Sequence, residues 1–175
     1  MEKLAVIATS LLISAPVLAQ SVGEKSGVSS ALGISPTTAD FVKEAAIGDM
    51  FEIQSSELAA YKGNEQTKGF ANQMITDHQN TTNALNSMVQ TGKAEASVPS
   101  TLDSSHQKML DKLRSLSGSD FNKQYKRDQV SAHKDAVSLF QRYAKGGDDA
   151  TLKDWSGKTL PHLEQHLEMA QNLEQ

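Results

Sequence analysis

The sequence predicts an all-α protein, a bundle of four long helices with an extra short helix in the connection between the second and the third. From Pro36 onward the apolar residues recur with the 3.6-residue period of amphipathic helices, and capping residues, glycines or a proline stand where each helix should begin or end. The sequence contains no clear run of alternating β-branched residues, and aromatic residues make up only 5% of the chain, so strands are not expected.

The first two long helices have clear start and stop signals. The first spans about 37–62, after a first-turn proline, and Gly63 ends it. The second spans about 64–91 with Asn64 as its N-cap, and Gly92 ends it. Because the link between them is so short, the two helices should be antiparallel neighbours.

A shorter helix is expected to follow Ser100, with Asp103 completing its cap and Gly118 near its end. It lies in the longer link between the second and third long helices. This link makes the middle crossover of the bundle, whose direction the pattern does not reveal.

The third long helix is expected to be capped by Ser119 and to span about 119–145, before the Gly146-Gly147 break. The fourth should begin near Asp148 and reach the C-terminus. Pro161 lies inside the fourth helix and is expected to kink it, because proline lacks the N–H that the helix needs.

The N-terminus reads as a targeting segment. Residues 1–19 combine an early lysine, an apolar run of about 16 residues and the small-residue ending "APVLA", which is typical of a secretory signal peptide cleaved after Ala19. A membrane anchor is the alternative, but the run is shorter than the ~20 residues that span a bilayer. The Ser- and Gly-rich residues 20–35 then form a flexible leader before the domain at 36–175.

The composition limits the cellular compartments and the binding partners that are expected. The chain has no cysteine, so it has neither a disulfide framework nor thiol chemistry. Its net charge is −4 with mixed signs throughout, and no basic stripe appears, which argues against nucleic acid as a partner. We therefore expect an exported protein, periplasmic or associated with the outer envelope, with no membrane span after cleavage. The sequence identifies no protein partner.

Each long helix carries one metal-capable side chain on its apolar, core-facing side: Glu52, His78, His133 and His166. A buried carboxylate is costly unless it is paired or binds a cation, and neutral imidazole is the commonest metal ligand in proteins. One carboxylate and three imidazoles in a bundle core suit a divalent transition metal such as Zn, Fe, Cu or Mn. Asp77 could orient a neighbouring imidazole from outside the ligand set.

A blander interpretation remains open, in which the core histidines are simply hydrogen-bonded. Counting from the helix breaks, His133 lies 13 residues before Gly146 and His166 lies 19 after Gly147, an offset of about 9 Å along the axis, so a tight site is not assured. His106 also sits on an apolar face, but in the short helix and without an evident partner set. His162 falls on the flank of its helix and should be exposed.

Four segments resemble an exported bacterial ferritin-like domain family of unknown function: "FVKEAAIGDMFEIQSSELA", "GFANQMITDHQNT", "LSGSDFNKQYKRDQVSAHKDAV" and "LKDWSGKTLPHLEQHLEMA". The resemblance covers about 36–174. The matching residues are Glu52, Asp77-His78, Tyr125, His133, Leu160-Pro161 and His166. The resemblance implies a ferritin-like bundle and supplies no activity. Asn122 departs from it, since the family usually has an aspartate there, and this position should affect the start of the third long helix.

Di-iron ferritins take a glutamate from two helices and Glu-x-x-His from the other two. Here Ile75 and Leu163 stand where the glutamates before His78 and His166 would be, so ferroxidase chemistry is not expected. Three hypotheses follow: an exported bundle with a single metal in its core, which we favour; a metal-dependent enzyme with Glu52 as the base; and a structural envelope or stress protein. No catalytic motif marks the chain as an enzyme.

Overall fold

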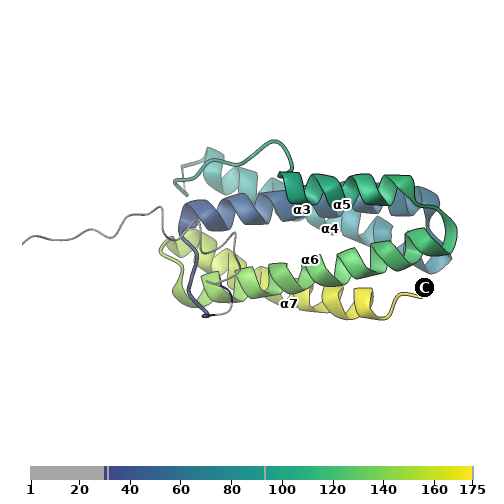
Figure 1. The fold of residues 1–175 in the computed structure, drawn as a ribbon. Coiled ribbons are helices and arrows are strands. Elements are labelled where there is room, and N and C mark those ends of the chain that lie inside the picture. Colours follow the sequence, from purple (N-terminus) through teal and green to yellow (C-terminus); the bar gives the residue numbers. More distant parts are fainter. Residues whose placement is uncertain (1–29, 31, 93, 175) are drawn as a thin grey trace, which may run out of the picture.

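A computed structural model describes residues 30, 32–92 and 94–174. Five helices make up this part of the chain: α3 (Thr38–Lys62), α4 (Glu65–Gln90), α5 (Ser104–Ser115), α6 (Gly118–Gly146) and α7 (Ala150–Gln171). No strand is present among these residues. The predicted all-α bundle, with one short helix between the second and third long ones, is therefore confirmed (Figure 1). The predicted signal peptide at 1–19 lies outside the described residues.

The four long helices pack around a square. α3 contacts α4 and α6, and α7 contacts α6 and α4, which puts α4 and α6 on opposite corners. The short links after α3 and α6 make two antiparallel pairs, as expected. The link that contains α5 runs back along the bundle, so that α4 and α6 point the same way (Figure 1). The middle crossover is thus a diagonal one, which the sequence pattern did not reveal.

Local capping chemistry explains most helix ends. Asn64 accepts a hydrogen bond from the N–H of Thr67 at the start of α4, as predicted. The next three helices begin a few residues from the expected positions: α5 starts after Asp103, which caps it as expected, α6 begins after Ser117, and α7 is capped by Asp149.

The reasons for these shifts are also local. Gly118 has φ +56°, and this left-handed conformation turns the chain from α5 directly into α6. Asp149 caps α7 in place of Asp148, because the carboxylate of Asp148 accepts a hydrogen bond from the hydroxyl of Thr38. The side chain of Asn122 accepts from the N–H of Asn64, so this residue supports the start of α4 rather than of its own helix.

The apolar core is divided into two clusters. One contains Phe41, Leu85, Phe140, Tyr143 and Leu152, and the other contains Phe51, Phe70, Met74, Tyr125 and Leu173. Along each long helix, polar buried residues fall between the two clusters. This polar layer consists of Asp49, Glu52, Ser55 and Ser56 of α3, His78 of α4, Gln129 and His133 of α6, and His166 of α7. It crosses the middle of the bundle and contains all four predicted metal-capable residues.

Three further features complete the description of the fold. At the end of the predicted leader, the carbonyl of Ile34 accepts a hydrogen bond from Arg142 of α6. None of the helices in the described ranges is both long and apolar enough to cross a membrane. α7 continues as one helix through Pro161.

Candidate metal centre

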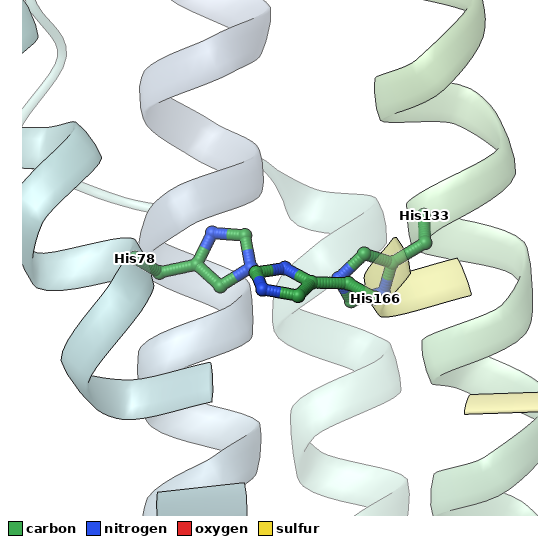
Figure 2. Close-up of side chains that lie close together, drawn as sticks. All are labelled: His78, His133 and His166. Carbon is green, nitrogen blue, oxygen red and sulfur yellow. The ribbon is translucent and has the colours of Figure 1, made fainter. Parts of the chain in front are cut away.

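Three histidines from three helices meet in the polar layer. His78, His133 and His166 are 3%, 0% and 5% exposed, and each pair of rings has its centroids 5.5 Å apart. One ring nitrogen from each can be chosen so that all three nitrogens lie within 4.8 Å of one another. Figure 2 shows the three imidazoles gathered in the space between the helices. The large offset between His133 and His166 expected from residue counting is therefore wrong.

Each imidazole is held by a hydrogen bond through one of its nitrogens. The Nδ1 of His78 lies 2.8 Å from Asp49 Oδ1, the Nδ1 of His133 lies 2.9 Å from the carbonyl oxygen of Gln129, and the Nε2 of His166 lies 3.0 Å from Asp77 Oδ2. Because carboxylate and carbonyl oxygens only accept, these nitrogens are the donors. The hydrogen bonds therefore fix which nitrogen of each ring can present a lone pair.

The opposite nitrogens have no partner. Nε2 of His78, Nε2 of His133 and Nδ1 of His166 are all buried and lack any hydrogen bond. Buried polar atoms are nearly always satisfied, and three unsatisfied atoms on three neighbouring rings are exceptional. Since imidazole can coordinate a metal through the nitrogen that does not donate, this arrangement can hold a cation.

Glu52 lies beside the three histidines. Its Oε1 is 3.8 Å from the Nδ1 of His133, and neither of its carboxyl oxygens has a hydrogen-bond partner. Burial raises the pKa of Glu52 to about 7, against the lowering effect of the charge of His78 and of the nearby Gln129 side chain. Glu52 is not part of the tight three-nitrogen group, so its place in the site is adjacent to that group.

The three histidines differ in their affinity for protons. Burial alone would lower the pKa of His78, but the hydrogen bond and charge of Asp49, together with Glu52 and Asp77, raise it above its usual value of 6.5. Burial and repulsion by His78 lower the pKa of His133 to about 3. The same two causes lower the pKa of His166, although Asp77 opposes them.

Asp49 was missed by the sequence reasoning. It is 8% exposed, and its second oxygen accepts from the hydroxyls of Thr81 and Thr82 at 2.8 and 3.2 Å. Its position three residues before Glu52, on the same face of α3, was the available signal. Asp77, by contrast, was expected to orient an imidazole and does contact one, that of His166 on another helix.

Two other histidines fall outside the group. His162 is exposed, as expected. His106 has a partner: its Nδ1 lies 2.9 Å from Asp103 Oδ1, and its ring packs 5.4 Å from that of Phe51. His106 thus has one local hydrogen-bond partner from the cap of α5 and is not part of the three-histidine group, as expected.

Replacing Asp49 with asparagine should lower the pKa of His78. The substitution removes the negative charge and weakens the hydrogen bond that together raise this pKa. An NMR titration of the histidine ring protons in metal-free protein measures the change. Asp77→Asn is the matched control, because it should shift the His166 titration more than that of His78. An unchanged His78 titration in Asp49→Asn would contradict the assigned role of Asp49.

One family model matches most of the sequence. A family model described as a domain of unknown function, DUF4142, matches residues 23–173. No curated protein and no solved structure gives a match.

Proposed function

This chain belongs to the DUF4142 family, and we propose that it binds one divalent transition-metal ion through His78, His133 and His166. One observation carries the proposal. Each of these buried rings donates through one nitrogen and leaves the other without a partner. A shared cation would satisfy all three remaining nitrogens at once.

The geometry is close to that of an occupied site. Metal–nitrogen bonds of ~2.1 Å at tetrahedral angles put ligand nitrogens about 3.4 Å apart, and one nitrogen from each ring lies within 4.8 Å of the others. Binding would thus draw the nitrogens together by up to about 1.4 Å. Hydrogen bonds that the rings donate to Asp49, Asp77 and the Gln129 carbonyl hold them in the way that outer partners hold metal-binding histidines.

Three imidazoles without thiolates suit Zn, Cu or Fe better than Mg or Ca, which prefer oxygen ligands. In the structural hypothesis the core histidines are held only by hydrogen bonds. This explains the partner of one nitrogen in each ring but does not explain why the other nitrogen is buried without a partner. The enzyme hypothesis, with Glu52 as a base beside the metal, is supported by the buried carboxyl group next to the histidines. We also propose, from the sequence alone, that the protein is exported to the periplasm and that it is related to ferritin-like proteins.

Metal analysis of untagged protein tests the proposal. We expect about one equivalent of a transition metal per chain after purification or after reconstitution with Zn²⁺ and desalting. Competition with a chromophoric chelator then gives the affinity. Protein that retains no metal and does not compete with a weak chelator would overturn the proposal.

Metal affinity should fall as the pH is lowered below the raised pKa of His78. The groups around His78 are Asp49 and Glu52 of α3, Asp77 of α4, and the other two histidines. Because His133 and His166 have lowered pKa values, His78 is the histidine that must lose a proton for metal to bind near neutral pH.

This dependence is best measured in the Glu52→Gln background, which removes the carboxyl group whose pKa is about 7. The logarithm of the affinity should then fall by about one unit per pH unit on the acidic side, since one proton competes with the metal. Chelator competition between about pH 5 and 8 gives the slope. A slope near zero, or one near three, would contradict the assignment of His78.

A further inference from the structure

A cavity lies against one side of the metal centre. Its volume is about 420 Å³, and its wall is formed mainly by α3 and α6 with His106 of α5. Gly48, Glu52, His78 and His133 all belong to this wall. The volume is at the small end of the ~300–1,000 Å³ that small-molecule sites occupy.

The wall of the cavity contains Glu52, a carboxyl group without a hydrogen-bond partner. The residue is 3% exposed, and both carboxyl oxygens lack a hydrogen-bond partner. Three protein ligands around a divalent metal leave at least one coordination position open, as in catalytic metal sites. Because His78 and His133 line the same cavity as Glu52, a molecule in the cavity could contact both the metal and the carboxyl group once the buried carboxyl oxygens turn toward the cavity.

The charges of the wall restrict the kind of molecule. Glu44, Asp49 and Asp135 line the cavity together with Glu52, and the cationic Arg142 donates to the Ile34 carbonyl. Four carboxylates, one cationic side chain and a divalent metal would together give a net charge of about −1 around the cavity, so an anionic ligand is disfavoured even with the metal bound. A neutral molecule has no such penalty.

We propose that this cavity binds a small neutral molecule that gives a lone pair to the metal and an N–H or O–H to Glu52. The inference rests on the proposed metal site. It identifies the class of ligand as a compact azole, amide or alcohol. Imidazole is the probe, because it is neutral at pH 8 and has both a lone pair and an N–H donor.

The test is a titration of cobalt-loaded protein with imidazole, followed through the visible Co²⁺ absorption bands. Gly48→Leu is the blocking variant. A Cβ at Gly48 meets no heavy atom within 4 Å, and leucine favours the helix more than glycine does, so the variant should fold and fill the cavity. Gly69→Leu is the matched control: Gly69 is also helical with open space around it, but it is exposed and away from the cavity.

We expect imidazole to change the cobalt spectrum of the wild type and of Gly69→Leu with equal affinity, and to bind Gly48→Leu at least tenfold more weakly. Cobalt affinity is measured first for each variant, and only saturated protein is titrated. Cobalt binding without a response to imidazole, or equal responses of the two leucine variants, would overturn this inference alone. Absence of cobalt binding would overturn the metal site as well.

The role of Glu52 is tested separately. Glu52→Ala should weaken imidazole binding about tenfold, whereas Glu52→Gln, which keeps an acceptor oxygen, should recover part of that loss. N-methylimidazole, which lacks the N–H, should bind the wild type and Glu52→Ala with similar affinity. Equal losses for both probes in Glu52→Ala would show that Glu52 does not accept the donor of the ligand.

Discussion

Replacing His78 with alanine should lower the affinity of the protein for divalent transition metal by a factor on the order of 10² to 10³. The estimate follows from apparent free energies of roughly 10–16 kcal/mol for four-ligand zinc sites, or about 3 kcal/mol for each ligand, at 1.4 kcal/mol per tenfold change. The substitution also leaves the buried Asp49 without the donor that now lies 2.8 Å away, so some stability should be lost as well. Chelator competition measures the first effect and thermal unfolding of the metal-free protein the second.

His162→Ala is the matched control for this experiment. His162 lies on the same helix as His166 but is exposed and outside the three-nitrogen group. We expect its metal affinity and its stability to equal those of the wild type. If the His78 and His162 variants bind metal equally well, then the three histidines do not form one site, and His78 is a buried histidine with a local partner.

Replacing Glu52 with glutamine should stabilise the metal-free protein at about pH 8 by about 3 kcal/mol. In the folded protein the pKa of Glu52 is raised from 4.5 to about 7, chiefly by burial. At 1.36 kcal/mol per pH unit, ionising this buried carboxyl group in the folded state costs that amount. Glutamine has a similar shape and no charge to bury.

The sign of the effect depends on pH. Below pH 4.5 the carboxyl group is protonated in both the folded and the unfolded states, so the wild type has no penalty and the two proteins should differ little. Between pH 4.5 and about 7 the unfolded state loses its proton first, and the advantage of glutamine grows to its full value. Glu52 and His78 influence each other, so the substitution also lowers the pKa of His78, and the comparison measures the two effects together.

Urea unfolding in the presence of a chelator, at several pH values, measures this difference. Glu57→Gln is the control, because Glu57 is on the same helix α3 but exposed, and it should change stability little at any pH. A Glu52→Gln variant that is less stable than the wild type at pH 8 would show that the carboxylate has a favourable partner in solution. A stabilisation would indicate that Glu52 is retained at a cost in stability, as is common at functional sites.

The sequence alone determined the helices of this protein. Gly63, Asn64 and the Gly146-Gly147 break act through the backbone conformation and hydrogen bonding of their own neighbours, so their effects could be read locally. The predicted helix starts after residue 100 differ from the observed ones by a few residues, because several capping side chains compete within each short link. The period of apolar residues likewise placed Glu52, His78, His133 and His166 on the core side, and all four are buried.

Only the tertiary structure decided how these residues meet. Residue counting put His133 and His166 six residues apart in level, but α6 continues to Gly146 and α7 begins only at Ala150. Measured from those ends the offset is three residues, about 4.5 Å, which the side chains can bridge. The level of one helix against another depends on where links turn and on packing between helices, and a helical period contains no information about either. For the same reason, the pairing of His78 with Asp49 of α3 and of His166 with Asp77 of α4 follows from contacts between helices and not from neighbours in the chain.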